Sequence, residues 1–320
     1  MQFSRKQFEF TLADGTKLSA TQLNPITQEK KSTIVFIHGL TAAHDIPQYR
    51  HFLSALAEKG HEVIAFDQPG HGNAEKPFSA ERSVNALSEV LAQLEKGSSP
   101  LGKRHEVFLA GHSLGGAIIA SHLAAGRQKH SAEVRGVLVF APPWRLKELT
   151  HVRAAEAAAR ASAMIPGSYV WNLVAGAGAA ALHPRMSTLR ERVDAVADVL
   201  KHRGKGITVD KMTHSSLEAL VKSISEIPDT AEMLQKAART SNLPATTVVL
   251  GTLDRIVGTA DAKRRKAFAA ELKAAGADVL EKPFPHVFKM DAEGKKQISA
   301  LAELADEKIR KMLSTSPRDY

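Results

Sequence analysis

The chain has 320 residues, 43% of them hydrophobic, which is enough to bury a large core in one domain or in a domain with a sizeable insertion. It contains no cysteine, which excludes disulfides, thiolate metal sites and a cysteine nucleophile. The formal charge of +9 comes from lysines and arginines spread along the chain, and only 5% of the residues are aromatic, so solvated helix faces explain the charge better than a nucleic-acid site does.

The first part of the chain alternates strand and helix patterns. Residues 6–23 alternate around Asp14-Gly15, which predicts a β-hairpin. Further strands are predicted at 32–37, 62–66, 106–110 and 135–140, with helices at 47–59, 80–96 and 114–126. Strands that alternate with helices predict a mostly parallel sheet covered by helices on both faces.

This alternation stops for about a hundred residues after Trp144. The pattern there is helical almost throughout, over 146–164, 168–182, 187–203 and segments of 214–239, and strands resume at 245–250 and 278–282 with helices at 261–275 and 293–313. We therefore predict an α/β fold with an eight-stranded sheet and a helical cap inserted after the sixth strand. The expected domains are residues 1–143 and 243–320 for the core and 144–242 for the cap.

The most informative motif is Gly-His-Ser-Leu-Gly at residues 111–115. It follows the apolar run 106–110 and opens the predicted helix 114–126, so Ser113 is expected on a sharp strand-to-helix turn with its hydroxyl exposed. The helix would direct free N–H groups and its positive end toward a developing oxyanion. The context indicates a nucleophilic serine, although the motif alone also fits an ordinary turn serine.

Several other motifs stand before and after this one in the chain. Gly-Thr-Leu-Asp-Arg-Ile-Val stands at 251–257 and Phe-Pro-His-Val at 284–287, after Phe-Ile-His-Gly-Leu at 36–40, Tyr49, Gly-His-Glu-Val at 60–63 and Asp-Gln-Pro-Gly-His-Gly at 67–72. Together they resemble the α/β-hydrolase superfamily, whose triad runs serine, aspartate, histidine along the chain. More narrowly, the chain is similar to the capped lysophospholipase and monoacylglycerol lipase group over nearly its whole length outside the lid.

The resemblance implies a catalytic triad. Ser113 would be the nucleophile, His286 the general base and Asp254 the carboxylate that orients His286. Among 14 histidines, His286 alone occupies the loop after the last predicted strand. Asp261 and Asp291 are nearby carboxylates that fit better as helix caps.

The resemblance also implies an oxyanion hole made by the backbone N–H groups of Leu40 and Leu114. His38, Asp67 and His71 are interpreted as structural residues of the neighbouring loops. The residues expected to contact the substrate are Gly39, His112, Trp144 and Trp171. No metal and no other cofactor is expected.

The apolar stretch 169–182, bounded by Pro166 and Pro184, suggests an acyl-chain pocket that also touches lipid surfaces, while packing of a lid helix on its neighbours explains it equally well. The implied activity is hydrolysis of carboxylic esters through an acyl-enzyme, on monoacylglycerols, lysophospholipids or other medium-to-long-chain esters. A thioesterase, an acyltransferase and an amidase remain alternatives of the same chemistry, and a non-enzymatic small-molecule receptor is an alternative of another class.

The expected setting is the cytoplasm. Residues 1–8 lack the apolar segment of a signal peptide, and no apolar run reaches the roughly 18 residues that span a bilayer. We expect no nucleic-acid partner and no integral membrane segment. The sequence leaves the oligomeric state open.

Overall fold

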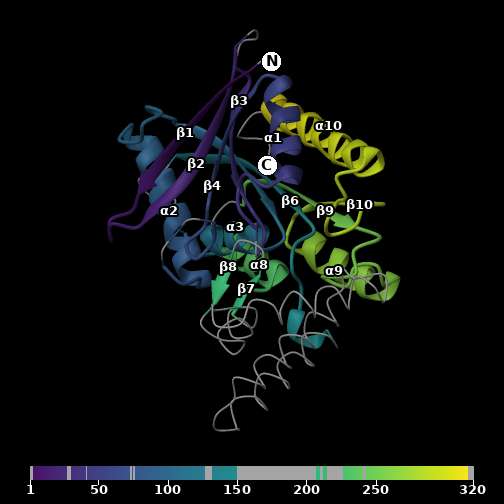
Figure 1. Cartoon of the computed structure of the whole chain (residues 1–320). Helices are drawn as coiled ribbons and strands as arrows, with labels where there is room; N and C mark the ends of the chain where they lie inside the picture. The colour runs from purple at the N-terminus through teal and green to yellow at the C-terminus, as the bar shows by residue number, and fades with distance from the viewer. Residues whose placement is uncertain are drawn as a thin grey trace.

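A computed structural model describes residues 3–26, 30–40, 42–72, 74, 76–126, 132–149, 207–209, 212–214, 226–240 and 243–315. Eight strands form its central sheet: β1 (Phe3–Thr11), β2 (Lys17–Pro25), β3 (Ser32–Ile37), β4 (His61–Phe66), β5 (Glu106–His112), β6 (Glu133–Phe140), β9 (Ala245–Gly251) and β10 (Asp278–Lys282). Their order across the sheet is β1-β2-β4-β3-β5-β6-β9-β10 (Figure 1). The pairings of β1 with β2 and of β2 with β4 are antiparallel, and the others are parallel.

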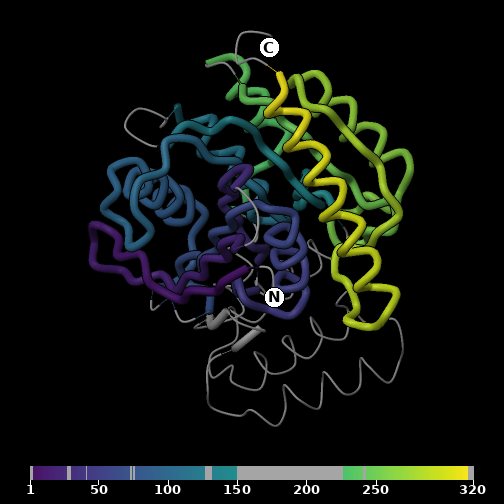
Figure 2. Tube along the Cα trace, turned by 90° about the horizontal axis from the view of Figure 1, so that it is seen from above, coloured from purple at the N-terminus to yellow at the C-terminus, as the bar shows by residue number. Residues whose placement is uncertain are grey.

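Helices cover both faces of this sheet. On one face, α1 (Pro47–Glu58) packs against α10 (Ala292–Ser314), and Figures 1 and 2 show the two side by side. On the other face lie α2 (Ala80–Lys96), α3 (Leu114–Ala124), α8 (Thr230–Thr240) and α9 (Ala262–Ala274), each packed against the next. The predicted mostly parallel, doubly covered sheet is thus confirmed.

The strand sequences explain the two covered faces. In β3, Val35 and Ile37 join the hydrophobic cluster under α2, α3, α8 and α9, while Ile34 and Phe36 join the cluster under α1 and α10. Successive side chains of a strand point to opposite faces, so a strand that is apolar at every position is buried on both sides. All six residues of β3 are buried.

The cap prediction falls largely on residues that the structure does not describe. Of the predicted helix 146–164, only a 3-10 turn at Leu146–Glu148 is described, and the predicted helices 168–182 and 187–203 lie outside the described residues. The domain boundaries at 143 and 242 therefore stay predictions. Helix α8 falls inside the predicted cap range, yet it packs against α3 and buries side chains in the core.

One part of the middle segment departs from the predicted helical pattern. Two short strands, β7 (Ile207–Val209) and β8 (Met212–His214), form an antiparallel pair. The pair falls between the predicted helical segments 187–203 and 214–239 and overlaps them only at His214, where the prediction was wrong. Ile207, Thr208 and Val209 are all β-branched and favour extended backbone, which explains the difference.

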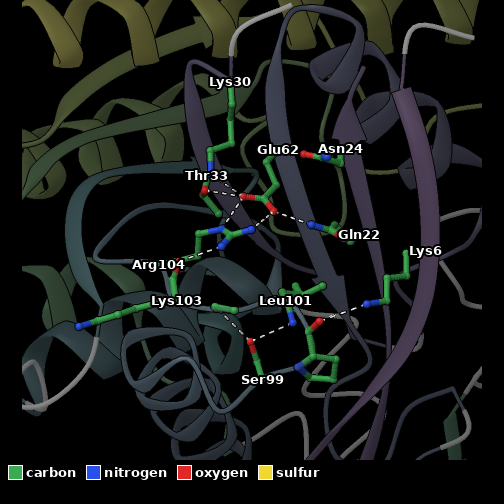
Figure 3. Close-up of polar contacts among 12 residues, drawn as sticks. Lys6, Gln22, Asn24, Lys30, Thr33, Glu62, Ser99, Leu101, Lys103 and Arg104 are labelled. Atoms are coloured by element: carbon green, nitrogen blue, oxygen red, sulfur yellow. Dashed lines mark hydrogen bonds and ion pairs between the residues drawn. The ribbon is translucent and has the colours of Figure 1, made fainter. Parts of the chain in front are cut away.

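At the amino ends of the parallel strands, a fully buried carboxylate ties three strands together (Figure 3). Glu62 in β4 accepts hydrogen bonds from Gln22 of β2, from Thr33 of β3 and, through both oxygens at 2.7 Å, from the guanidinium of Arg104. Burial alone would raise the pKa of Glu62, but the hydrogen bonds from Arg104 and Thr33 and the charge of Arg104 outweigh it and lower the pKa to about 2. Glu62 therefore stays ionised and paired.

Within the described residues, no helix combines the length and the apolar character that a bilayer span needs.

Candidate active site

Ser113 sits on the predicted sharp turn, directly between β5 and α3. Its backbone has φ 52° and ψ −118°, and it is one of three described non-glycine residues with positive φ. Such a conformation is sparsely populated for a residue with a Cβ atom and persists only where the surroundings enforce it. The turn thus has the strained backbone that was predicted for Ser113.

The two glycines of the motif permit this turn because backbone passes very close to each. A Cβ on Gly115 would lie 2.1 Å from the carbonyl oxygen of Ile37, and one on Gly111 would lie 2.7 Å from the carbonyl carbon of Gly115. A side chain at Gly115 would push the end of β3 away from the start of α3, and one at Gly111 would push α3 away from β5. The motif thus brings the loop after β3 next to Ser113.

His286 and Asp254 form a buried pair in the loops after β10 and β9. The Nδ1 atom of His286 lies 2.7 Å from Oδ2 of Asp254. A carboxylate only accepts hydrogen bonds, so Nδ1 of His286 carries the proton and Nε2 is left as the basic nitrogen. Asp254 is fully buried and His286 is 7% exposed.

The Asp254 carboxylate is held on its second oxygen as well. Its Oδ1 accepts from the backbone N–H groups of Ile256 and Val257, at 2.9 and 3.1 Å. The aspartate thereby closes a tight turn after β9 and keeps Oδ2 directed at His286. This backbone support fixes the orientation of the imidazole ring.

Ser113 and His286 line the same cavity, together with Gly39 and Leu40 of the loop after β3. Each of these residues follows the carboxyl end of a parallel strand, the edge at which open α/β sheets bind ligands. A Cβ at Gly39 would lie 3.1 Å from both Tyr49 Oη and His112 Nδ1, so a side chain there would displace these two groups by a few tenths of an ångström. The structure therefore brings the predicted nucleophile, base and oxyanion loop together.

The predicted oxyanion donors lie on either side of Ser113. Leu114 is the first residue of α3, and the first N–H groups of a helix have no intrahelical acceptor. Leu40 lines the cavity from the loop after β3. Both positions agree with the predicted role, and the oxyanion hole itself remains a prediction.

The loop after β3 is held by His38, as its structural interpretation predicts. His38 Nε2 accepts from the backbone N–H of Gln68 at 2.9 Å, and Nδ1 lies 2.8 Å from the carbonyl oxygen of Gly39. Burial lowers the pKa of His38 to about 4, so the ring is neutral at pH 7. His38 fixes the loop and does not line the cavity.

Asp67 and His71, the other two residues interpreted as structural, also lie in buried contacts outside the cavity. Asp67 Oδ1 accepts from the backbone N–H and from Nδ1 of His44, each at 2.8 Å. Burial would raise the pKa of Asp67, but these bonds and the charge of His44 outweigh it and lower the pKa. The His71 ring packs edge-on against the rings of His38 and Phe78.

His112 links the oxyanion loop to the loop that carries His286. Its Nε2 lies 3.0 Å from the backbone carbonyl oxygen of His286, and its Nδ1 lies 2.9 Å from Tyr49 Oη, which accepts from the N–H of Gly39 at 3.0 Å. Because a carbonyl oxygen only accepts, Nε2 of a neutral His112 donates and Nδ1 accepts from the tyrosine hydroxyl. The chain of hydrogen bonds runs from the backbone N–H of Gly39 through Tyr49 and His112 to the carbonyl oxygen of His286.

The two competing carboxylates are helix caps, as predicted. Asp261 accepts from the backbone N–H of Arg264 at 2.7 Å at the start of α9, and Asp291 accepts from that of Gly294 at 2.8 Å at the start of α10. Each N-cap satisfies a helix donor that would otherwise be unpaired.

Two of the four predicted substrate contacts, Gly39 and His112, line the cavity. Trp144 lies elsewhere: its ring stacks on Phe268 of α9 at 5.1 Å, and its Nε1 donates to Glu271 at 2.9 Å. Trp171 lies outside the described residues. Substrate contact by either tryptophan stays a prediction.

Sequence reasoning missed much of the cavity wall. Tyr49 entered only as part of a family motif, and the apolar side chains that α1 and α10 supply look like ordinary helix core positions in the sequence. A metal centre gains no support: among the described residues, no group of three or more histidine and acidic side chains could hold an ion.

The arrangement of sheet, elbow and loops is that of an α/β hydrolase. An esterase of Pyrococcus furiosus superposes with a TM-score of 0.59 at 15% identity, covering 97% of this chain and 90% of that one. An α/β hydrolase of Penicillium superposes with a TM-score of 0.60 at 16% identity, covering 97% and 99%. At these identities the likeness concerns the fold.

The chain belongs to the S33 serine aminopeptidase family, whose model matches residues 28–282. A Schizosaccharomyces pombe protein named "Putative monoglyceride lipase" is 31% identical over 114 residues, which are 35% of this chain. The match spans 29% of that relative's length, less than a third. The family assignment therefore rests on the longer match.

Proposed function

We propose that the protein is a serine hydrolase that cleaves carboxylic esters, with Ser113, His286 and Asp254 as its catalytic triad. The observation that carries the proposal is the strained Ser113 facing the same cavity as His286, whose Nδ1 is bonded to the buried Asp254. The family, the lipase-like relative and the esterase neighbour support the same class of chemistry.

In the first half-reaction, Nε2 of His286 takes the hydroxyl proton as Ser113 Oγ attacks the ester carbonyl carbon. The oxyanion is stabilised by the N–H groups of Leu40 and Leu114. When the intermediate collapses, the bond to the alcohol oxygen breaks and His286 gives its proton to that oxygen. Asp254 keeps the imidazole in the required tautomer and stabilises its cationic form.

In the second half-reaction, His286 removes a proton from water, which attacks the acyl-enzyme at the same carbonyl. Collapse of this second intermediate releases the carboxylic acid and returns the proton to Ser113 Oγ. No step needs a metal ion or a redox cofactor, because all proton transfers are made by His286.

The proposal extends to the class of ester. Monoacylglycerols, lysophospholipids and other medium-to-long-chain esters are favoured by the apolar stretch 169–182, which lies outside the described residues. The same acyl-enzyme could be formed from a thioester or an amide, and the family's aminopeptidase label makes the amide the alternative to test first.

Labelling with a fluorophosphonate probe tests the proposal. The wild-type protein and the Ser121→Ala variant, altered at a serine on α3 outside the cavity, should be labelled at equal rates, and Ser113→Ala should not be labelled. A folded wild-type protein without Ser113-dependent labelling would contradict the hydrolase proposal. Matched esters, thioesters and amides of one acyl group should then be cleaved fastest as esters.

A further inference from the structure

An apolar cavity of about 80 Å³ opens beside Ser113 and extends between α1, α10 and the sheet. At its mouth, Leu40, Ser113 and Val287 are half-buried. Its inner wall combines buried side chains from four elements: Phe36 of β3, Phe140 of β6, Phe52 of α1, and Ile298 and Leu301 of α10.

The inner end of this cavity is closed. None of the five inner side chains is more than 8% exposed. The rings of Phe52 and Phe140 meet edge-on at 5.4 Å, and that of Phe36 meets Tyr49 at 5.0 Å. A group that enters at Ser113 therefore meets a floor of aromatic and branched side chains.

The lining also defines the chemistry of the occupant. Among the residues that the structure describes, no aspartate, glutamate, lysine or arginine lines the cavity. Of its polar side chains, Gln48 donates to the carbonyl oxygen of Phe288 at 3.3 Å, and Tyr49 and His112 bond each other. A charged or hydroxylated group would lose its hydration here without replacement, so the cavity suits an apolar group.

We propose that this cavity binds the acyl half of the ester, an inference that rests on the proposed function. The alcohol must leave after the first half-reaction, and water must then reach the acyl-enzyme from the side of His286. The acyl group instead stays attached to Ser113 Oγ through both half-reactions. An apolar cavity that is closed at its inner end therefore suits the acyl group, which stays on Ser113. The alcohol and the water that replaces it need an open route to the solvent.

The size of the cavity limits the acyl group. An apolar cavity of about 150 Å³ holds a benzene molecule, so one near half that volume holds roughly two to four carbons. The cavity therefore selects acetyl to butyryl esters, shorter than the acyl chains that the apolar stretch 169–182 suggests. Leu301 and Phe52 would set the cutoff, because these two buried side chains line the cavity from two different helices.

The test measures kcat/KM for p-nitrophenyl acetate, butyrate, hexanoate and octanoate. In the wild type, octanoate should be cleaved at least about tenfold less efficiently than butyrate. Leu301→Ala should raise the octanoate-to-acetate ratio by about tenfold or more, and Phe52→Leu should raise it in the same direction. Leu304→Ala, the same change at a half-buried residue of α10 that does not line the cavity, should leave the ratio within about twofold.

A second series, ethyl to octyl acetate, separates the two halves of the ester. If Leu301→Ala alters preference for the alcohol and leaves the acyl series unchanged, the cavity holds the alcohol and the inference is wrong. A wild type that prefers octanoate would also overturn it. Fluorophosphonate labelling of each variant reports whether its active site is folded. If Leu301→Ala is not labelled, the acyl preference of Phe52→Leu tests the inference instead.

Failure of the proposed function has a different signature, because no Ser113-dependent labelling or hydrolysis would then be seen with any ester. If labelling and hydrolysis are retained but the octanoate-to-acetate ratio of kcat/KM does not change in the variants, only the assignment of the cavity to the acyl group is wrong.

Discussion

Two buried aspartate–histidine pairs in this molecule look alike at the level of side chains. Asp254 holds Nδ1 of His286 at 2.7 Å, and Asp67 holds Nδ1 of His44 at 2.8 Å. The second pair even has a hydroxyl in place, because Thr21 Oγ1 lies 3.0 Å from Nε2 of His44. A cavity of about 160 Å³ borders Thr21 and His44, so access to a cavity does not separate the two pairs.

The backbone around the hydroxyl separates them. Thr21 lies within β2 and pairs with Gln7 of β1 and Ala65 of β4, so the strand's N–H groups are engaged in the sheet. Ser113 instead stands on a strained turn at the start of α3, where helix N–H groups have no intrahelical acceptor. A hydroxyl, a histidine and an aspartate can carry out acyl transfer only where backbone donors also meet the developing oxyanion, and we propose that the Ser113 set meets this condition.

A third buried set of a hydroxyl, a histidine and an aspartate lies away from both cavities. Ser32 Oγ lies 2.8 Å from Nδ1 of His61, whose Nε2 lies 3.0 Å from Oδ1 of Asp306. Burial lowers the pKa of His61, and the set joins β3, β4 and α10. Its residues line neither cavity and act as a structural clamp.

The largest effect should come from Asp254→Asn. Asn would keep an oxygen for the N–H groups of Ile256 and Val257 and turn its amide NH₂ toward His286. The imidazole is then forced into the tautomer whose Nε2 carries the proton and cannot accept that of Ser113, so kcat should fall about 10⁴-fold. Steady-state kinetics on p-nitrophenyl butyrate measure this loss.

Asp306→Asn is the matched control in the third set. The amide oxygen can still accept from Nε2 of His61, so kcat should stay within about threefold of wild type. If Asp306→Asn lost as much activity as Asp254→Asn, the pair of Asp254 and His286 would have no special role in the reaction.

Glu62→Gln should lower stability by on the order of 3 kcal/mol at pH 7, since it leaves Arg104 without its buried carboxylate. The pKa of Glu62 is lowered from 4.5 to about 2, so its contribution is complete above pH 4.5 and is lost as pH falls toward 2. Urea unfolding between pH 7 and pH 2 should show that decline in the wild type and a flatter profile in the variant. Parallel profiles would contradict the ionised pair.

Tyr49→Phe removes the hydroxyl that joins Gly39 to His112. One buried N–H and one ring nitrogen lose a partner, which costs about 1 to 3 kcal/mol. We expect kcat for short esters to fall about tenfold with KM changing less, because the oxyanion loop and the His286 loop lose their link. An unchanged kcat would show that the link does not position the site.

The smallest effect is expected for Thr21→Val. It removes the hydroxyl near His44 and nearly preserves the shape of the side chain, so the free energy of unfolding should change by no more than about 1 kcal/mol. The melting temperature reports this change. Hydrolysis of p-nitrophenyl butyrate should change less than about twofold. A large loss of hydrolysis would move the chemistry from Ser113 toward Thr21.

Much of the core could be predicted from the sequence, because its signals are local. The β-branched run 32–37 became β3 with the same bounds, and the predicted helix 80–96 became α2 with a Ser79 cap and Gly97 in the left-handed conformation. Glycines around Ser113 predicted the elbow because only close backbone approach explains them.

The rest depends on contacts between distant segments. The partner of Tyr49 lies 63 residues along the chain, and the cavity floor joins α1 to α10. In the sequence, Phe52 and Leu301 fit helix core positions, and no periodicity says which core position borders a cavity. The β7–β8 pair was not predicted either, although it lies between predicted helices and residues 207–209 are all β-branched.

Acid quenching during turnover of p-nitrophenyl butyrate, followed by peptide mass spectrometry, tests the central claim most directly. A butyryl adduct should accumulate on the peptide that contains Ser113, at the serine itself, and on no peptide that contains Thr21 or Ser32. Turnover with the adduct on either of those residues, or with Ser113→Ala as active as wild type, would contradict the account.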